Sequence, residues 1–236
     1  VIAKLLLFPS KFIDISDFAK SWKWYDEPVN FHAQQDAAEF VQLLLNQLME
    51  HLPVASELFQ GEICHKTVGT NFDFTSQVNE KFFIFPLEVN GHSCVEESFK
   101  AFLMPDVFEG EDQYEIESVG KINAKRFHWI SKSPQILILQ LKRFSYNIKT
   151  GKREKTCHGL NNEYSFPLSL DLKSIMMPQL EEETILYDLI AIEMHSGDAG
   201  GGHYFSFCGP PCTSSEKMRS WYKFDDTEAV KVNLKN

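Results

Sequence analysis

One histidine and two aspartates are the residues of this sequence best suited to acid–base chemistry. His203 follows three glycines in GGGHYFSF, and Asp225 and Asp226 end the segment WYKFDD. Both segments are rich in aromatic residues, which favours strands. If they pair as an antiparallel hairpin symmetric about Ser214, His203 lies opposite Asp225, whereas a one-residue slip would place Asp226 there. A histidine beside a glycine-rich turn is more often structural, but these carboxylates could orient its ring as in a nucleophilic triad.

The nucleophile that such a pair would serve is not evident among the five cysteines. Cys94 is predicted near the start of a short helix, where a thiol ionises more readily, but Glu96 and Glu97 in the same turn oppose a thiolate. A small buried cysteine is therefore the better interpretation of Cys94. Cys208 lies five residues after His203 and projects from the opposite face of the predicted strand.

Three pairs of potential metal ligands lie close together in the sequence. They are Cys64 with His65, His92 with Cys94, and Cys157 with His158. None has the CxxC or HxxxH spacing of a zinc site, and adjacent residues on a strand point to opposite faces. The sequence therefore predicts neither a metal nor another cofactor.

The elements that must position these residues are helices first and strands later. Apolar residues recur at helical spacing over residues 36–52, and Asp36 with Glu39 fits a capping box. A short helix is predicted at residues 93–103 with Ser93 as its N-cap, and strands at 82–89, 134–144, 185–195, 202–208 and 220–226. The apolar strand at 134–144 should be buried on both faces. This order indicates an α+β protein with a largely antiparallel sheet.

Composition narrows the class of protein. The 236 residues are 43% hydrophobic and carry a net charge of −10, which fits a folded domain and argues against general nucleic-acid binding. No apolar run reaches the roughly 18 residues of a membrane span, and the N-terminal segment lacks the features of a signal peptide. Five widely spaced cysteines do not form a disulfide framework, so an intracellular location in cytoplasm or nucleus is expected.

Four ordered segments resemble the conserved blocks of ubiquitin-specific proteases, which are papain-like cysteine peptidases also called ubiquitin carboxyl-terminal hydrolases. The segments are QQDAAEF at residues 34–40, ILILQLKRF at 136–144, HSGDAGGGHYFSF at 195–207 and WYKFDD at 221–226. The resemblance spans nearly the whole chain. It implies a single partial catalytic domain with a papain-like fold, in which residues 1–60 are a helical thumb remnant and residues 61–236 form fingers and palm.

The reaction that the resemblance implies is thiol-dependent hydrolysis of the bond after the C-terminal glycine of ubiquitin. The partners would be ubiquitin or ubiquitinated proteins, with no nucleic acid and no membrane. His203 would be the general base, Asp225 its orienting carboxylate and Asp226 a supporting carboxylate.

The resemblance also implies a site for the ubiquitin tail. Gln34, Asp36 and Glu39 would contact the tail, whose arginines suit the two carboxylates, although the same carboxylates could also cap a helix. Three further residues match positions that line the tail channel of the family: Phe144, His195 and Tyr204.

Two departures from the family pattern bear on its chemistry. Many members carry a zinc ribbon of two CxxC pairs, but this sequence has YEIESVG at the second pair and only Cys64 of the first, so the metal should be absent. Nothing between Val1 and Phe31 resembles the Asn-Gly-Asn-Thr-Cys type box that holds the family's nucleophile. The chain is therefore expected to be truncated and inactive alone. An inactive ubiquitin-binding module and a protease for a ubiquitin-like modifier are the alternatives.

Overall fold

The structure, a computed structural model, describes residues 13–30, 33–156, 164–173, 175, 185–209 and 220–232. The chain forms two compact units, residues 1–47 and 48–236. The division between thumb and palm predicted at residue 60 concerns the family's subdomains and stays a prediction. No helix in the described ranges is long and apolar enough to cross a membrane.

The first unit contains short helices and a tight hairpin. Its elements are α2 (Ser16–Ser21), β1 (Lys23–Trp24), β2 (Glu27–Pro28) and most of α3 (Ala37–His51). Tyr25 and Asp26 join the two strands with φ angles of 50° and 68°, which is the left-handed backbone of a type I′ turn. The helix predicted at residues 36–52 is confirmed as α3. The hairpin is not predicted, because its turn contains no glycine.

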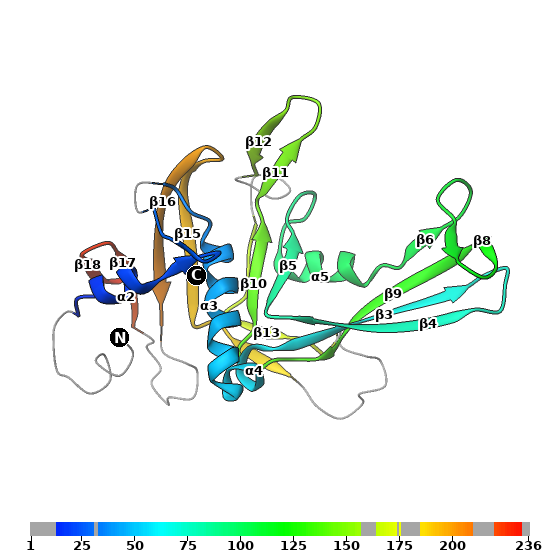
Figure 1. The fold of residues 1–236 in the computed structure, drawn as a ribbon, viewed down its shortest axis with the longest axis horizontal. Coiled ribbons are helices and arrows are strands. Elements are labelled where there is room, and N and C mark those ends of the chain that lie inside the picture. The colour runs from blue at the N-terminus through cyan, green and yellow to red at the C-terminus, as the bar shows by residue number, and fades with distance from the viewer. Residues whose placement is uncertain are drawn as a thin grey trace. The chain divides into compact units, whose positions relative to one another are not determined.

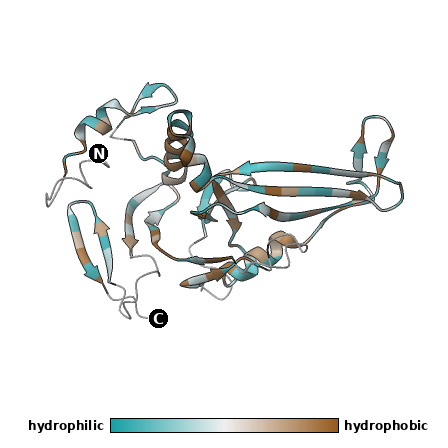
Figure 2. Ribbon diagram, turned by 90° about the horizontal axis from the view of Figure 1, so that it is seen from below, coloured by the Kyte–Doolittle hydropathy of each residue, from teal (hydrophilic) through white to brown (hydrophobic). Residues whose placement is uncertain are grey.

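A four-stranded antiparallel sheet, called the long sheet below, follows helix α4 (Pro53–Phe59). Its strands lie in the order β4 (Thr75–Phe82), β3 (Gly61–Gly69), β9 (Ala124–Lys132) and β6 (Asp106–Phe108). A further hairpin, β7 (Tyr114–Ile116) with β8 (Gly120–Ile122), lies between β6 and β9 in the sequence (Figure 1). Hydrophilic and hydrophobic residues are interspersed along the long strands (Figure 2), which is why apolar runs alone do not reveal most of this sheet.

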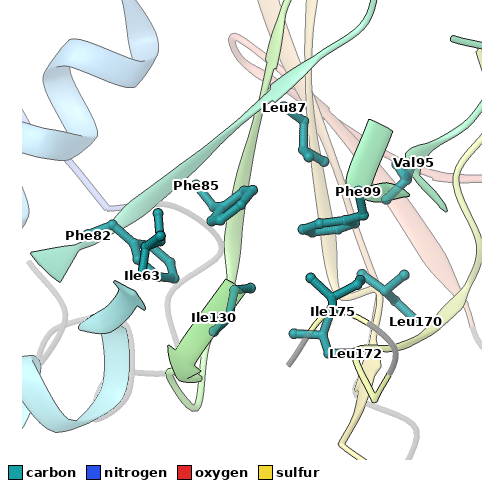
Figure 3. Close-up of a cluster of buried hydrophobic side chains, with 10 residues drawn as sticks. All are labelled: Ile63, Phe82, Phe85, Leu87, Val95, Phe99, Ile130, Leu170, Leu172 and Ile175. Atoms are coloured by element: carbon teal, nitrogen blue, oxygen red, sulfur yellow. The ribbon is translucent and has the colours of Figure 1, made fainter. Parts of the chain in front are cut away.

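The main core of the second unit lies where β5 (Ile84–Glu88) and α5 (Val95–Leu103) meet the long sheet. Phe85 and Phe99 lie near its middle with ring centroids 5.3 Å apart, and both are almost completely buried. Ten buried side chains form this core (Figure 3): Ile63, Phe82, Phe85, Leu87, Val95, Phe99, Ile130, Leu170, Leu172 and Ile175.

The apolar segment at 134–144 forms a shorter and less buried strand than predicted. Among the described strands, β10 (Ile138–Lys142) pairs only with β5, in parallel. Leu139 and Leu141 pack against the core, whereas Gln140 and Lys142 are exposed. The prediction that this strand is buried on both faces is therefore wrong, because only alternate residues face the core.

The start of α5 also differs from the prediction. The helix begins at Val95, so Cys94 occupies the N-cap position instead of Ser93, and no side chain caps the helix there. Ser93 instead donates hydrogen bonds from its backbone N and from Oγ to Oε2 of Glu97, each at 2.7 Å. These hydrogen bonds lower the pKa of the Glu97 carboxyl and fix the chain just before the helix.

The remaining strands form hairpins and a second four-stranded sheet. Strand β11 (Phe144–Asn147) pairs with β12 (Lys152–Lys155), and β13 (Ser169–Asp171) pairs with β14 (Leu186–Asp188). The second sheet, called the C-terminal sheet below, contains β15 (Ala191–Asp198), β16 (Gly201–Cys208), β17 (Trp221–Asp225) and β18 (Glu228–Val232) in sequence order (Figure 1). Among the described strands only β5 and β10 pair in parallel, so the predicted α+β fold with a largely antiparallel sheet is confirmed.

Candidate functional site

The glycine run before His203 closes the tight turn between β15 and β16. Asp198 pairs with Gly201 across a two-residue turn, and Oδ1 of Asp198 accepts a hydrogen bond from the backbone N of Gly200 at 2.8 Å. A Cβ atom on Gly202 would lie 2.2 Å from the carbonyl oxygen of Ser196, which no side chain could tolerate. The absence of a side chain at this position therefore lets β15 and β16 pair closely and fixes the start of the strand that carries His203.

His203 contacts Asp225, as predicted, but the strands pair in a different register. Strands β16 and β17 pair Ser206 with Phe224, which is a shift of two residues from the predicted alignment. A shift of two keeps every side chain on its own face, so Asp225 becomes a diagonal neighbour of His203. Nε2 of His203 donates a hydrogen bond to Oδ1 of Asp225 over 2.6 Å.

The second oxygen of Asp225 is held by a lysine on the same strand. Nζ of Lys223 donates to Oδ2 of Asp225 at 2.5 Å and lies 4.4 Å from the centroid of the Phe205 ring. The Phe205 ring is nearly parallel to the imidazole of His203, with centroids 6.4 Å apart. Asp225 is therefore bridged between a histidine and a lysine, which restricts its rotation and orients the histidine ring.

Asp226 adds a second negative charge to this group. It occupies the turn between β17 and β18 with a φ of 49°, a left-handed conformation that aspartate adopts more readily than most residues. Ligand atoms of His203, Asp225 and Asp226 all lie within 4.8 Å of one another. The three residues predicted to be catalytic are thus brought together, while their roles stay predictions.

The electrostatics of the pair favour an ionised contact. The hydrogen bond to Asp225 raises the pKa of His203 above its ordinary value of 6.5, and the charge of Asp226 adds to this effect. The hydrogen bond from Lys223, followed by that from His203, lowers the pKa of Asp225 below its ordinary value of 3.8. The histidine's contribution to stability is lost as pH rises through its raised pKa, and the aspartate's as pH falls through its lowered pKa. Both contributions are complete between pH 3.8 and pH 6.5.

The other ring nitrogen of His203, Nδ1, is the one available for proton transfer. Within the described ranges no side chain forms a hydrogen bond with it, and the histidine side chain is 47% exposed. Because Nε2 is occupied by Asp225, a proton from an incoming thiol or water would be accepted at Nδ1.

Phe144, His195 and Tyr204 form a second group in the same unit. The imidazole of His195 lies 5.3 Å from the ring centroid of Phe144 and 4.7 Å from that of Tyr204. Nζ of Lys155 donates to Nδ1 of His195 and to its carbonyl oxygen at 2.8 Å each, and to the carbonyl oxygen of Gly197 at 2.9 Å. Because the lysine ammonium can only donate, Nδ1 accepts, and Nε2 of a neutral His195 carries the proton. The structure therefore brings these three predicted residues together around a lysine.

The start of α3 carries the other three residues predicted to bind the tail. Oδ1 of Asp36 accepts hydrogen bonds from the backbone N of Ala38 at 2.8 Å and of Glu39 at 3.1 Å, so the predicted cap at Asp36 is confirmed. Glu39 does not complete a capping box; its Oε1 accepts from the hydroxyl of Tyr25 at 2.8 Å and raises the pKa of that tyrosine. Gln34 and Asp36 are exposed, whereas Glu39 is half-buried.

The described cysteines do not supply an evident nucleophile. Cys64 is completely buried in β3, and burial raises the pKa of its thiol. Cys94 is half-buried at the N-cap of α5, and Cys208 lies on β16 at a position of opposite parity to His203. Cys157 and Cys212 lie outside the described residues.

The residues present do not fit the zinc ribbon of the family. Residues 114–120, where the second CxxC pair is expected, form the hairpin of β7 and β8 and include neither cysteine nor histidine. Arg126 packs there instead, with its guanidinium 5.0 Å from the ring centroid of Phe108 and 5.5 Å from that of Tyr114. Cation–π contacts and strand pairing therefore hold this part of the chain.

Two lysines at the site are missing from the sequence predictions. Lys223 could have been found from alternation, because it lies two residues before Asp225 on the same face of a predicted strand. Lys155 lies directly opposite Phe144 in the hairpin of β11 and β12. The contact of Lys155 with Phe144 becomes evident only when the register of that hairpin is known.

A profile of the ubiquitin carboxyl-terminal hydrolase family matches residues 3–236. The chain is 28% identical over 237 residues to ubiquitin carboxyl-terminal hydrolase 5 of Schizosaccharomyces pombe, covering 98% of this chain and 20% of that protein. It is 32% identical over 241 residues to the probable ubiquitin carboxyl-terminal hydrolase FAF of Drosophila melanogaster, covering 90% of this chain and 8% of that protein. The chain thus spans a fifth or less of the length of these relatives.

Solved structures show the same fold. The SAGA Ubp8/Sgf11/Sus1/Sgf73 DUB module bound to ubiquitin aldehyde matches with a TM-score of 0.71 and 23% identity, covering 86% of this chain and 46% of that chain. A variant of that module bound to monoubiquitin matches with a TM-score of 0.70 and 25% identity over the same shares of the two chains.

Proposed function

The chain belongs to the ubiquitin carboxyl-terminal hydrolase family, and we propose that it carries the base, its orienting carboxylate and the tail-binding residues of a cysteine-type deubiquitinase. The reaction would be hydrolysis of the bond after the C-terminal glycine of ubiquitin. The observation that carries this proposal is the 2.6 Å hydrogen bond from Nε2 of His203 to Oδ1 of Asp225. It occupies one ring nitrogen and leaves the other for proton transfer, as a nucleophilic mechanism requires.

His203 would move protons in both halves of the reaction. A cysteine thiol from outside the described residues would give its proton to Nδ1 of His203, and the thiolate sulfur would attack the carbonyl carbon of the last glycine. The imidazolium would then return this proton to the leaving amine, which produces a thioester. In the second half, His203 would take a proton from water, and the hydroxide would displace the thiolate, to which the imidazolium returns that proton. The acid that is released loses its own proton to solvent and becomes the ubiquitin carboxylate. Asp225 would stabilise the imidazolium in each half, because it holds the pKa of His203 above its ordinary value.

Each of the two units carries one group of residues that would contact the ubiquitin tail. Asp36 and Glu39 would attract the basic residues of the tail, since Asp36 uses only Oδ1 to cap α3. The aromatic group of Phe144, His195 and Tyr204 would enclose the narrow glycine-terminated end. Lys155 would hold His195 in place for this role through its hydrogen bonds at 2.8 Å.

Titration of isotope-labelled ubiquitin with this chain, followed by NMR, tests the binding part of the proposal. We expect shifts concentrated in the C-terminal tail of ubiquitin, and weaker binding by the double variant Asp36→Asn with Glu39→Gln. Glu50→Gln is the matched control, because Glu50 is exposed in the last turn of the same helix. Unchanged ubiquitin spectra in the presence of the folded chain would contradict the proposal.

An electrophilic ubiquitin tail probe tests where the nucleophile lies. We expect no adduct on Cys64, Cys94 or Cys208, because none of them has the geometry to react with His203. An adduct on one of these cysteines, mapped by mass spectrometry, would show that the chain supplies its own nucleophile and would overturn that part of the mechanism. Tail shifts without an adduct would also be expected of an inactive binding module, which a cleavage assay with a fluorogenic ubiquitin substrate separates from an enzyme.

A further inference from the structure

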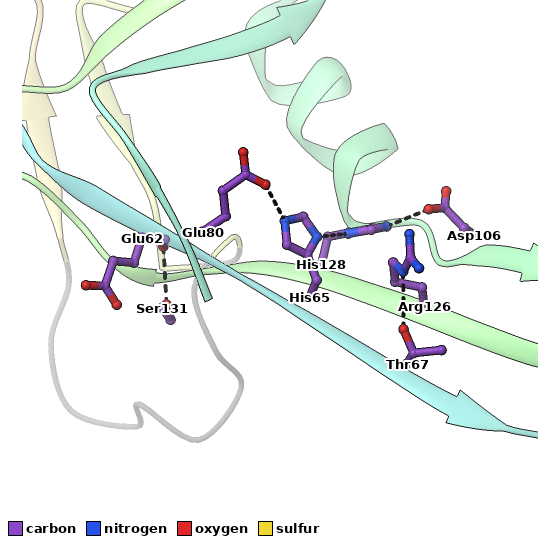
Figure 4. A network of polar contacts seen from close by, with 8 residues as sticks. All are labelled: Glu62, His65, Thr67, Glu80, Asp106, Arg126, His128 and Ser131. Atoms are coloured by element: carbon purple, nitrogen blue, oxygen red, sulfur yellow. Dashed lines mark hydrogen bonds and ion pairs between the residues drawn. The ribbon is translucent and has the colours of Figure 1, made fainter. Parts of the chain in front are cut away.

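Two histidines face each other on neighbouring strands of the long sheet, away from the residues already discussed. His65 on β3 is directly paired with His128 on β9, and their Nδ1 atoms lie 2.8 Å apart (Figure 4). Their side chains are 25% and 12% exposed, respectively, so both rings are mostly buried. Nothing in the proposed reaction uses these two residues.

Each histidine has a carboxylate behind it. Nε2 of His65 lies 3.3 Å from Oε2 of Glu80 on β4, and Nε2 of His128 lies 3.0 Å from Oδ2 of Asp106 on β6 (Figure 4). The four strands of the long sheet thus contribute one residue each to a row of carboxylate, imidazole, imidazole and carboxylate. Nε2 of His128 forms a hydrogen bond with Asp106, whereas Nε2 of His65 lies within ion-pair distance of Glu80 but forms no hydrogen bond with it, and the two inner nitrogens face each other.

This arrangement leaves one position to be filled between the two rings. If both Nδ1 atoms lacked a hydrogen, two lone pairs would face each other at 2.8 Å, and if both carried one, two N–H groups would collide. The contact is satisfied when one proton is shared between the two Nδ1 atoms, so that one nitrogen donates and the other accepts.

We propose that His65 and His128 form a binding site for one divalent late transition-metal ion, such as Zn²⁺, which takes the place of the shared proton. Both Nδ1 lone pairs would coordinate the ion, the shared proton would move to Nε2 of His65 or to solvent, and water would complete the coordination. The two positive charges of the ion would then balance the two carboxylates. Imidazole nitrogens suit Zn²⁺, Ni²⁺ and Cu²⁺, and carboxylates that accept from the far ring nitrogens are the usual second layer of such sites.

The geometry requires only a small opening of the pair. Zn–N bonds of about 2.0–2.1 Å in a tetrahedral site place two nitrogens roughly 3.3 Å apart. The Nδ1 atoms at 2.8 Å must therefore separate by about half an ångström, which small rotations of the two rings can provide. Phe102 packs against the ring of His128 with centroids 5.8 Å apart and limits larger movements.

Arg126 lies on the same face of β9 as His128 but is directed elsewhere. Nε of Arg126 donates to Oγ1 of Thr67 at 3.2 Å, and its guanidinium lies over the rings of Phe108 and Tyr114. The site also differs from the zinc ribbon of the family, since its ligands are histidines and the adjacent Cys64 lies on the opposite face of β3.

Calorimetric titration of the chain with Zn²⁺ tests the proposal, with the variant His203→Asn as the background. That background removes a ligand from the cluster of His203, Asp225 and Asp226, which could also bind metal. We expect saturation at one ion per chain. His65→Asn and His128→Asn should each abolish this binding. His51→Asn, an exposed histidine at the end of α3, is the matched control and should leave it unchanged.

Two carboxamide variants keep the test decisive if a histidine variant fails to fold. Glu80→Gln and Asp106→Asn preserve side-chain shape and should each weaken Zn²⁺ binding by about tenfold to a hundredfold. The melting temperature of the chain should also rise with added Zn²⁺ and fall back with chelator. Absence of a saturable site, or the same affinity in these two variants as in the background chain, would overturn the proposal. This outcome is independent of whether the chain binds ubiquitin.

Discussion

Two sites in this molecule combine histidines with carboxylates, but their geometries suit different chemical roles. In the C-terminal sheet one nitrogen of His203 is bound by Asp225 and the other faces outward, with the side chain 47% exposed. In the long sheet the Nδ1 atoms of His65 and His128 face each other, Nε2 of His128 is bound by Asp106, and the His128 side chain is only 12% exposed. A general base needs a nitrogen that can exchange a proton with a reactant, so only the first arrangement suits catalysis.

The carboxylates of the two sites also differ in what holds them. Asp225 is bridged to Lys223, which fixes it as an orienting group and lowers its pKa. The side chains of Glu80 and Asp106 are 68% and 57% exposed, so each is more exposed than the histidine that it contacts. A histidine beside a carboxylate is therefore insufficient evidence of a catalytic pair, and the occupancy of the second nitrogen separates the two cases.

The largest expected effect is on hydrolysis. In an enzyme that contains this chain together with its nucleophile, His203→Gln should lower the rate of cleavage at the ubiquitin C-terminus by about 10²–10⁴-fold, because the proton acceptor is lost. His128→Gln should leave this rate unchanged, since that ring belongs to the other site. Cleavage assays with a fluorogenic ubiquitin substrate measure both. Comparable rates for His203→Gln and the parent enzyme would remove His203 from the mechanism.

The turn that presents His203 should be sensitive to side-chain volume. Gly202→Val should destabilise the fold by about 1–3 kcal/mol, because its Cβ would meet the carbonyl of Ser196 and the ring of His195. Gly200→Ala is the control; its Cβ would approach only Oδ1 of Asp198, at 3.2 Å, and the cost should stay within about 0.5 kcal/mol. Urea denaturation gives both values. Equal stability of the two variants would show that the hairpin is not packed as described.

Loss of Lys223, which distinguishes the His203 site from the histidine pair of the long sheet, should have a smaller effect, on two pKa values. Lys223→Met should raise the pKa of Asp225, because the strongest hydrogen bond to this carboxylate disappears. It should also raise the pKa of His203, because the charge of Lys223 lowers it in the parent chain. NMR pH titrations measure both, with exposed Lys231→Met on β18 as the control. A fall in the His203 pKa would mean that Lys223 acts mainly by holding Asp225 in place.

Much of the C-terminal sheet could be predicted from sequence, whereas most of the long sheet could not. Aromatic and branched residues mark β16 and β17, and alternation places His203 and Asp225 on one face even though the register differs by two residues. The contact survives this error because a shift of two conserves parity, and long polar side chains reach diagonal neighbours.

The features that the sequence does not predict depend on contacts between segments that lie far apart in the sequence. His128 has no special neighbour in the sequence, and its pairing with His65 exists only through the β3–β9 register. Lys155 meets His195 across 40 residues of sequence, and Glu39 meets Tyr25 through a hairpin whose turn lacks glycine. Local patterns carry no information about such pairs, which are set when the strands assemble. The cap at Asp36, by contrast, is local and is predicted correctly.

The central claim is that Asp225 prepares His203 to accept a proton, and NMR titration of the His203 imidazole tests it most directly. In the parent chain the pKa should lie above 6.5, and in Asp225→Asn it should fall toward that value, because the hydrogen bond to Asp225 is the largest cause of the raised pKa. Asp226→Asn should produce a smaller fall, since Asp226 acts only through its charge. An identical titration midpoint in the parent chain and Asp225→Asn would contradict the account.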